Sequence, residues 1–564
     1  MEALDWLVIG VFFLALIGII VWVVRQKQND SADYFLGGRD ATWLAIGASI
    51  FASNIGSEHL IGLAGAGASS GMAMAHWEIQ GWMILILGWV FVPFYTRSIV
   101  YTMPEFLERR YNPQSRTILS VISLVSYVLT KVAVTVYAGG LVFQQVFGIK
   151  ELWGIDFFWI AAIGLVVLTA LYTIFGGMKS VLYTSVLQTP ILLLGSLIIL
   201  VLGFKELGGW DEMMRVCGAV TVNDYGDTMT NLIRSNDDAN FPWLGALIGS
   251  AIIGFWYWCT DQFIVQRVLS GKNEMEARRG TIFGAYLKLL PVFLFLIPGM
   301  IAFALHQKYI GAGGEGFLPM LANGTANADA AFPTLVAKLL PAGVKGLVVC
   351  GILAALMSSL ASLFNSSAML FTIDFYKRFR PETPEKKLVG IGQVATVVIV
   401  ILGILWIPIM RSVGDVLYTY LQDVQSVLAP GIAAAFLLGI CWKRTSAQGG
   451  MWGLIAGMVI GLTRLGAKVY YSNAGEVADS TFKYLFYDMN WLFFCGWMFL
   501  FCIIVVIVVS LATKAPTAEK IQGLVFGTAT KEQKAATRAS WNHWDIIHTV
   551  IILAITGAFY WYFW

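Results

Sequence analysis

The sequence predicts an all-α membrane protein with about fourteen transmembrane helices. Of its 564 residues, 58% are hydrophobic and 13% are charged, and the mean hydropathy is +0.73. Soluble globular domains do not have this composition. Apolar runs of roughly 18–25 residues, the length that crosses a bilayer, recur from end to end. The net charge of +3 is too small to indicate a nucleic-acid partner.

The lengths of the apolar runs place the helices in order. The first run is too long for a signal-peptide core and no small-residue cleavage site follows it, so we expect it to be retained. The run 335–376 exceeds one simple span, so we expect it to tilt, bend or project from the membrane. The predicted helices cover residues 5–24, 42–66, 73–97, 117–146, 155–174, 181–203, 241–268, 281–305, 335–376, 388–408, 414–442, 447–466, 489–512 and 542–563.

Basic residues in the loops predict the orientation. Lys and Arg gather in alternate loops, such as the one with Arg109, Arg110 and Arg116, whereas the loops 204–240 and 467–488 hold few. Because positive loops stay on the cytoplasmic side, we expect both termini outside. The six cysteines show no metal-ligand spacing, and no phosphate-loop motif is present. A nucleophile–base pair is also missing, so we do not expect an enzyme.

The second predicted helix is interrupted at its middle by polar residues. Its sequence IGASIFASNIGSEHLIGLAG places Ser53, Asn54, Gly56, Glu58 and His59 within an apolar span. Glycine and polar residues at this depth are typical of a discontinuous helix, whose freed carbonyls can coordinate a cation. The alternative is that these side chains only hold neighbouring helices together.

The ninth predicted helix carries hydroxyls on one face. Ala355, Ser358 and Ser359 have the i, i+3, i+4 spacing that brings side chains together on a helix. Hydroxyl and carbonyl oxygens are hard ligands that suit an alkali cation rather than zinc or copper. Serines are also common in membrane helices, so the hydroxyls indicate a cation site only together with the interrupted second helix.

Three further polar residues lie in apolar segments, next to aromatic ones. Glu78, Lys288 and Gln422 offer donors and acceptors for hydroxyl groups, and the rings of Tyr257 and Trp258 can stack on a sugar. This combination favours a neutral polyhydroxylated solute. The alternative is a buried Glu78–Lys288 salt bridge that binds no ligand.

A charged residue and a histidine in other apolar stretches receive structural roles. Asp261, in the stretch FWYWCTDQFIVQR, is six residues from Arg267 and so does not share its helix face. We expect Asp261 to cap a helix or form an ion pair rather than bind substrate. His76 precedes Trp77 and Glu78, and we expect this lone histidine to be a hydrogen-bonded structural residue.

These stretches resemble the solute:sodium symporter family, and specifically its sodium–glucose cotransporter branch. The similarity runs from residue 43 to 445 and includes FASNIGSEHLIGLAG, GFWYWCTDQFIVQRVLSGKN, GAYLKLLPVF and LAALMSSLASLFNSS. The resemblance implies a five-plus-five inverted-repeat core with discontinuous helices at the membrane midplane. It implies five segments, namely 1–41 (first helix and inner loop), 42–203 (repeat 1), 204–240 (outer loop), 241–442 (repeat 2) and 443–564 (peripheral helices).

The resemblance also implies roles for individual residues. It places a sodium ion at the backbone carbonyls of Ala52, Ile55 and Ala355 and the hydroxyls of Ser358 and Ser359. It assigns sugar contacts to Asn54, His59, Glu78, Lys288 and Gln422, with Tyr257 as an inner gate and Trp258 beside it. Leu63, Trp77 and Tyr418 match outer-gate positions.

Three positions depart from the family. Ser185, in YTSVLQT, replaces an aspartate associated with a second sodium site, so we expect one sodium per sugar. Gly254 replaces a polar residue, and Glu58 stands where glycine is usual; both leave the sugar undetermined. We expect no cofactor other than sodium.

The resulting prediction is a sodium-coupled symporter that imports a neutral monosaccharide of the glucose or galactose type by alternating access. The alternatives are symport of myo-inositol, sialic acid or an amino acid, and a sodium-dependent membrane sugar sensor. We expect a multi-pass protein of the plasma membrane, of the bacterial inner-membrane type. A single chain should suffice for transport, and the oligomeric state is left open.

Overall fold

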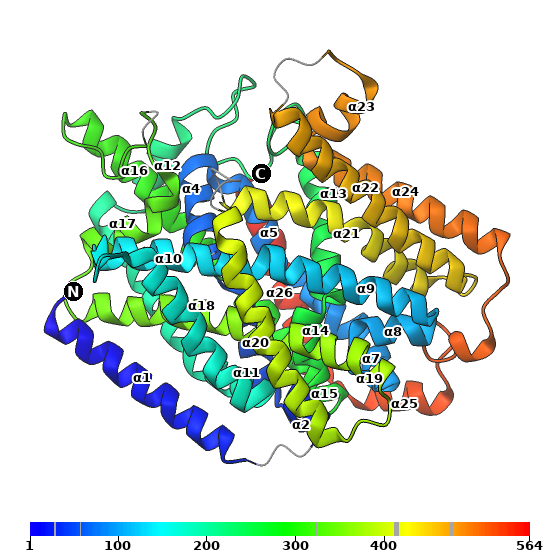
Figure 1. Ribbon diagram of the computed structural model, residues 1–564. Helices are drawn as coiled ribbons and strands as arrows, with labels where there is room; N and C mark the ends of the chain where they lie inside the picture. The colour runs from blue at the N-terminus through cyan, green and yellow to red at the C-terminus, as the bar shows by residue number, and fades with distance from the viewer. Residues whose placement is uncertain (27–29, 57, 322–323, 411–416, 474–477) are drawn as a thin grey trace.

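The structure is a computed structural model that describes residues 1–26, 30–56, 58–321, 324–410, 417–473 and 478–564. It is a bundle of helices (Figure 1). Within the described residues, eleven helical segments are long and apolar enough to cross a membrane. The number is below fourteen because some segments, such as 157–207, contain two of the predicted spans. The prediction of an all-α protein with many membrane spans is confirmed.

The helices and the short β1–β2 hairpin of the described residues follow one another along the chain, with η marking 3-10 or π turns. Residues 1–150 form α1 (Ala3–Val24), α2 (Ser31–Leu36), η1 (Gly37–Arg39), α3 (Trp43–Asn54), η2 (Glu58–Leu63), α4 (Ala64–Ser70), η3 (Gly71–Met74), α5 (Ala75–Glu78), α6 (Gly81–Ile86), η4 (Leu87–Phe91), α7 (Val92–Ser98), α8 (Met103–Arg110), α9 (Pro113–Ser126), η5 (Tyr127–Val132) and α10 (Ala133–Phe147). Residues 151–380 form β1 (Glu151–Leu152), β2 (Ile155–Asp156), α11 (Phe157–Leu207), α12 (Trp210–Gly218), α13 (Trp243–Gly254), η6 (Phe255–Thr260), α14 (Gln262–Leu269), α15 (Glu274–Lys288), η7 (Val292–Leu296), α16 (Ile297–Gly311), η8 (Ala328–Ala330), α17 (Ala331–Leu339), α18 (Val344–Met369), η9 (Leu370–Tyr376) and α19 (Lys377–Phe379). The rest form α20 (Glu385–Met410), α21 (Leu417–Cys441), α22 (Ala447–Asn473), α23 (Thr481–Lys483), η10 (Tyr484–Asp488), α24 (Trp491–Ala512), η11 (Ala518–Lys520), α25 (Lys531–Ala539) and α26 (His543–Tyr562).

The predicted helices 155–174 and 181–203 are joined in one helical segment, α11, that bends at Gly177. This glycine has φ 54° and ψ −147°, which only glycine adopts without strain. An added Cβ there would collide with the backbone carbonyl of Tyr34. Two spans of the predicted length therefore follow each other across a bend instead of a loop.

The predicted helix 335–376 is divided instead of continuous. It forms α17 and α18, which are separated at residues 340–343 because Pro341 lacks a backbone donor and Gly343 has φ 80°. Asp5 of α1 accepts hydrogen bonds from the backbone N–H groups of Gly343 (2.7 Å) and Gly346 (2.8 Å). The carboxylate thus satisfies free donors at the start of α18.

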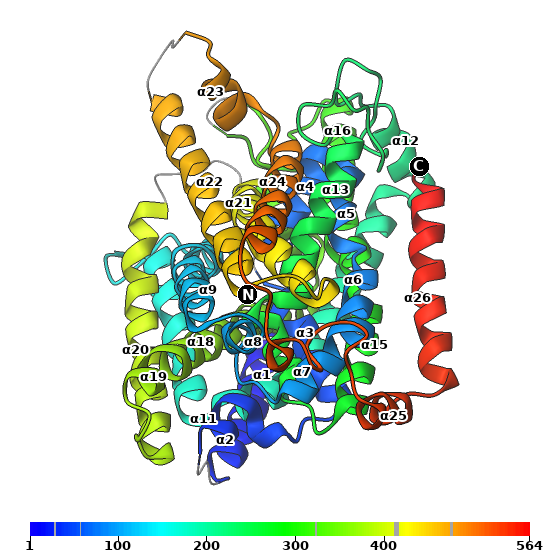
Figure 2. The same ribbon diagram turned by 90° about the vertical axis from the view of Figure 1, so that its right-hand side faces the viewer.

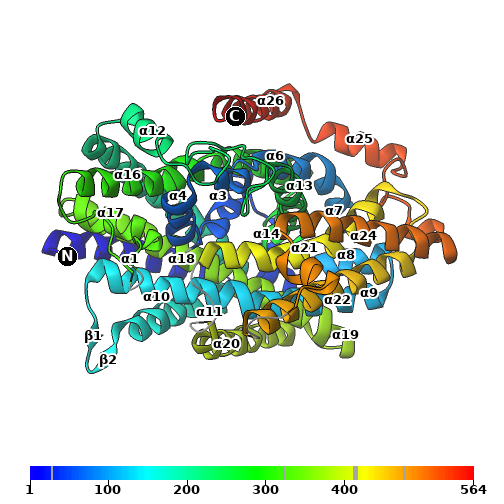
Figure 3. The same ribbon diagram turned by 90° about the horizontal axis from the view of Figure 1, so that it is seen from above.

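Short helices lie at both ends of the bundle. Figure 2 shows α2, α19 and α25 at one end and α12 and α23 at the other. Seen from above, α20 and α26 lie on opposite sides of the bundle (Figure 3). In the interior, α11 packs along α18 and α3 packs along α15. The interrupted segment after α3 therefore lies among the most buried helices.

Candidate functional site

A polar cavity lies where the interrupted segment after α3 meets α5, η6, α15, α18 and α21. Nine of the residues predicted from the sequence line it, namely Asn54, His59, Trp77, Glu78, Tyr257, Trp258, Lys288, Ser359 and Gln422. The volume open to the centre of a water molecule is about 50 Å³. One water needs about 10–15 Å³ by this measure, so the cavity in this conformation has room for a few waters. A six-membered ring would require the lining side chains to move.

Glu78 is the centre of the polar groups in the cavity. Its Oε2 lies 2.5 Å from Lys288 Nζ and 3.3 Å from His59 Nε2. Lys288 also donates to Asn54 Oδ1 at 3.2 Å. All four side chains are buried. The predicted salt bridge is present, and it belongs to the same cluster as the predicted sugar contacts.

Glu78 and Lys288 meet at the ends of two helices. Glu78 ends the four-residue helix α5, which is held by His76: its Nδ1 lies 2.9 Å from the Tyr560 hydroxyl and its Nε2 3.1 Å from the Leu232 carbonyl. Lys288 is the last residue of α15, three residues before Pro291. Both charged groups therefore project from helix ends. The expected structural role of His76 is confirmed.

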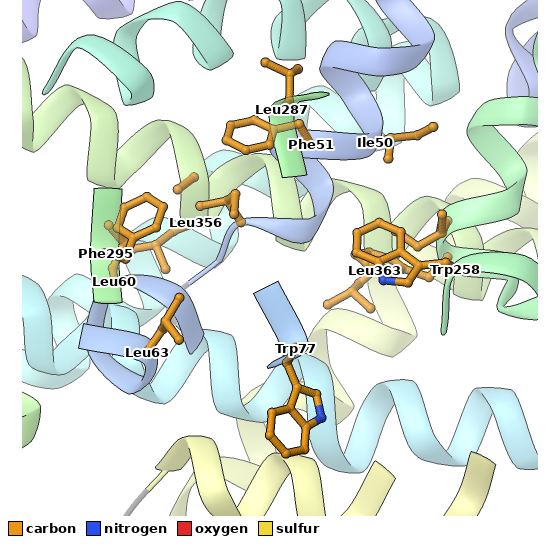
Figure 4. Close-up of a cluster of buried hydrophobic side chains, with 14 of the residues drawn as sticks. Ile50, Phe51, Leu60, Leu63, Trp77, Trp258, Leu287, Phe295, Leu356 and Leu363 are labelled. Atoms are coloured by element: carbon orange, nitrogen blue, oxygen red, sulfur yellow. The ribbon is translucent and has the colours of Figure 1, made fainter. Parts of the chain in front are cut away.

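The aromatic residues come from a π turn. In η6 the widened turn places Tyr257 and Trp258 side by side, with ring centroids 4.9 Å apart. Asn54 Nδ2 donates to the Tyr257 hydroxyl at 3.1 Å, and Lys288 Nζ lies 5.3 Å from the Trp258 ring centroid. In Figure 4, Trp258 lies beside Leu363 of α18. These contacts connect the two halves of the chain across the cavity.

Lys131 is a further charged residue at the cavity, and the sequence did not predict it as a site residue. Lys131 lies in the π turn η5, lines the cavity and pairs with Asp261 Oδ2 at 2.6 Å. Its Nζ is 4.7 Å from the centroid of the Tyr257 ring. Asp261 also caps α14 by accepting from Phe263 N–H and bonds to the Tyr127 hydroxyl. The helix-capping and ion-pairing roles expected of Asp261 are confirmed. Its partner Lys131 could have been suspected from the sequence, because it is a charged residue inside the apolar run 117–146.

Two lining side chains have polar atoms without a partner among the described residues. These atoms are Trp77 Nε1, a donor, and Gln422 Oε1, an acceptor. Trp77 stacks on Trp491 with centroids 5.5 Å apart. Because buried polar groups are almost always hydrogen-bonded, these two atoms are available to the hydroxyls of a ligand or to water.

Gly254 and Glu58, two positions that differ from the family pattern, both lie at the cavity. An added Cβ at Gly254 would meet Gln80 Oε1 at 2.6 Å, so Gln80 occupies the space of the missing polar side chain. Gln80 accepts from Trp258 Nε1 at 3.2 Å. Glu58 lines the cavity. Its carboxylate lies against Gly56, where an added Cβ would be 2.5 Å from Glu58 Oε2.

The predicted sodium ligands lie on two helices that are in contact, α3 near its end and α18. Ile55 leaves the helix with φ −81° and ψ 105°, so the carbonyls of the last turn, including that of Ala52, have no helical donor four residues on. On α18, Ala355, Ser358 and Ser359 are buried. The helices touch through Ser53 and Ser362, whose hydroxyl oxygens are 2.6 Å apart.

Ser185 joins this region from α11. Its hydroxyl donates to the Val181 carbonyl at 2.6 Å and lies 3.2 Å from Ser358 Oγ. Of the outer-gate positions, Trp77 lines the cavity, whereas Leu63 is buried in η2 and is not among its lining residues (Figure 4). The side chain of Tyr418 lies outside the described residues.

A helical bundle that encloses a polar cavity beside a broken helix defines a membrane carrier. The chain matches the model of the sodium:solute symporter family over residues 34–457 and belongs to that family. It is 36% identical over 542 residues to a sodium/myo-inositol cotransporter 2 of Mus musculus, covering 94% of this chain and 80% of the relative. It is also 36% identical over 537 residues to a sodium/glucose cotransporter 4 of Danio rerio, covering 92% and 80%.

A solved structure supports the fold. The substrate-bound, outward-open structure of a Na⁺-coupled sialic acid symporter matches with a TM-score of 0.72, covering 92% of this chain and 99% of that chain at 21% identity. At this identity the match shows the fold alone. The structural match confirms the predicted multi-span fold. The family confirms sodium as the coupling ion. The chain is therefore a multi-pass, sodium-coupled solute transporter.

Proposed function

We propose that this protein imports a neutral, polyhydroxylated ring, a monosaccharide of the glucose or galactose type, together with one sodium ion. The observation that carries the proposal is the cluster around Glu78. Lys288, His59 and Asn54 converge on one small cavity, with Tyr257 and Trp258 as an aromatic wall. Such a set offers charged and neutral hydrogen-bonding groups to several hydroxyls at once. Glu78 and Lys288 neutralise each other, which favours an uncharged solute.

The sodium site and its coupling rest on the junction of α3 and α18. Sodium at the carbonyls of Ala52, Ile55 and Ala355 and the hydroxyls of Ser358 and Ser359 would hold the interrupted segment against α18. Asn54 directly precedes Ile55, so ordering this segment also orders a sugar ligand. The coupling must be reciprocal, because each ligand tightens the other by the same factor. Ser185, a neutral residue beside Ser358, supports one sodium ion instead of two.

Transport by alternating access follows from the inverted repeats 42–203 and 241–442, which would rock against each other around the cavity. Tyr257 and its neighbour Lys131 close the route on one side, and Trp77 stacked on Trp491 closes the other. Release would begin with loss of sodium, followed by movement of Tyr257. The membrane potential adds about 2.3 kcal/mol per sodium charge at 100 mV.

A second candidate solute is myo-inositol, because relatives named for it are 36% identical over 94% of the chain. Uptake of labelled galactose, glucose and myo-inositol into proteoliposomes under a sodium gradient distinguishes these solutes. Potassium and proton gradients serve as controls. Sodium-dependent accumulation of a hexose supports the proposal, and accumulation of myo-inositol alone replaces the hexose. Sodium-dependent binding without accumulation would indicate a sensor, and no binding of any ring would refute the proposed solute class.

A further inference from the structure

A large apolar groove lies on the outside of the bundle, on the opposite side from α26. It runs between α9, η9 and the outer face of α20, and we call it the α20 groove; Val125, Phe371, Tyr376, Lys387, Gly390 and Val394 are among its lining residues. Its volume is about 1220 Å³, whereas pockets for small ligands typically have about 300–1,000 Å³. Figures 2 and 3 show α20 at the edge of the bundle. Val394 is 64% exposed, so this groove faces the membrane.

The length of the groove suits one lipid chain. From Gly390 to Leu402, two of its lining residues, α20 rises about 18 Å. One leaflet contributes about 15 Å of hydrocarbon to a bilayer. Gly390 widens the groove, because a Cβ added there would meet nothing within 4 Å. An acyl chain can therefore lie along α20 from one membrane surface to the middle.

One end of the groove is basic. Residues 377–387 hold five Lys or Arg and two Glu. Within this stretch Lys377 pairs with Glu385 at 2.9 Å, and Arg378 bonds to the Pro113 carbonyl. Lys387 is exposed at the mouth and forms no ion pair or side-chain hydrogen bond within the described part of the chain. Tyr376 lines the same end, and its phenol is a hydrogen-bond donor.

We propose that the α20 groove binds an anionic phospholipid of the cytoplasmic leaflet. The phosphate lies at Lys387 and Tyr376, and one acyl chain lies along α20. Basic clusters directly next to a membrane helix attract anionic headgroups by about 1 kcal/mol per Lys or Arg, or about fivefold in affinity. A sterol lacks the anionic group that this end would recognise. The groove is separate from the polar cavity, so the inference does not depend on the transported solute.

The test is titration of the delipidated full-length protein with phosphatidylglycerol and phosphatidylethanolamine, followed by native mass spectrometry. We expect one tightly held phosphatidylglycerol and weaker phosphatidylethanolamine. Lys387→Gln should weaken phosphatidylglycerol about fivefold and phosphatidylethanolamine less, because the ammonium of the latter already offsets its phosphate charge. The matched control is Lys386→Gln, an exposed neighbour that is not among the groove's lining residues.

A second pair of variants tests the apolar part. Gly390→Trp fills the groove and should weaken both lipids at least tenfold. Gly164→Trp is the control, because Gly164 is also a half-buried helical glycine with nothing within 4 Å of an added Cβ. Equal affinity for both lipids, retention of the lipid in Gly390→Trp, or a sterol that competes for the site would each overturn the proposal. So would a dimer of the wild-type protein that separates in Gly390→Trp. If Gly390→Trp fails to fold, the Lys387→Gln comparison decides the outcome.

Discussion

The Glu78–Lys288 pair permits a test that separates ligand binding from structural support. The two groups are 2.5 Å apart, with residue exposures of 1% and 3%. Removing one member of a buried ion pair leaves an uncompensated charge and costs about 3–5 kcal/mol, whereas replacing both costs far less. We therefore expect Glu78→Gln and Lys288→Met each to destabilise the protein, and the double variant to recover at least about 2 kcal/mol.

Sugar binding should not recover in the double variant. A hydrogen bond to a charged group contributes about 1.5–3 kcal/mol, so each single variant should raise the Kd for sugar by about ten- to a hundredfold. The double variant lacks both charged ligands and should bind at least as weakly as either single one. Thermal unfolding measures stability, and isothermal titration calorimetry with sodium present measures sugar binding.

An exposed ion pair supplies the control. Arg215 and Glu212 are 2.7 Å apart, but the arginine side chain is 70% exposed. Glu212→Gln, Arg215→Met and their double variant should leave both the thermal stability and sugar binding nearly unchanged, because exposed ion pairs contribute little. If the Glu78/Lys288 double variant regains both stability and sugar affinity, the pair is purely structural and the assigned site is wrong.

Two further predictions concern the sodium site and an acidic residue outside the membrane spans. Ser359→Ala should raise the sodium concentration for half-maximal uptake several-fold with a smaller change in maximal rate, because one hydroxyl ligand is lost; an unchanged sodium dependence removes Ser359 from the site. Burial raises the pKa of Asp329 from about 3.8 to about 6, so the native state binds its proton more tightly than the unfolded state and stability falls as pH rises from about 4 to 6. The shift corresponds to at most about 3 kcal/mol, and solvent screening of this partly exposed carboxyl reduces this to about 1–2 kcal/mol. Asp329→Asn should therefore raise the Tm by the order of 1–2 °C at pH 7.5 and by about a third of that at pH 4.5, and an equal gain at both values contradicts the assignment.

The sequence predicted the spans and the broken second helix because both depend on local properties. Apolar length determines a membrane helix, and the polar run around Gly56 could not continue as a lipid-facing one. The break within 335–376 also has a local cause, because Pro341 and Gly343 interrupt the helix. The prediction missed this break because it considered only the length of the apolar run.

Long-range pairing could not be predicted from local properties. Lys131 was visible as a lysine in an apolar run, but its partner Asp261 lies 130 residues away. Gln80 occupies the space next to Gly254, and the sequence spacing of these two residues does not predict that contact. The π turns, such as η6, also leave no periodic signal. Most site residues were visible as polar or aromatic residues in apolar segments, whereas their individual roles and Trp77 came from the family resemblance. Nine of these residues line one cavity.

The short helix α5 is held from both sides by the last part of the chain. Trp491 stacks on Trp77, and Tyr560 bonds to His76, so two helices beyond the inverted repeats hold the four residues that end in Glu78. In the proposed site, these helices therefore support the residues that would bind the solute. Substitutions near Trp491 or Tyr560 offer a way to tune solute affinity without altering any group that contacts the solute. A shortened chain that ends after the repeats should retain the ligands but lose their alignment.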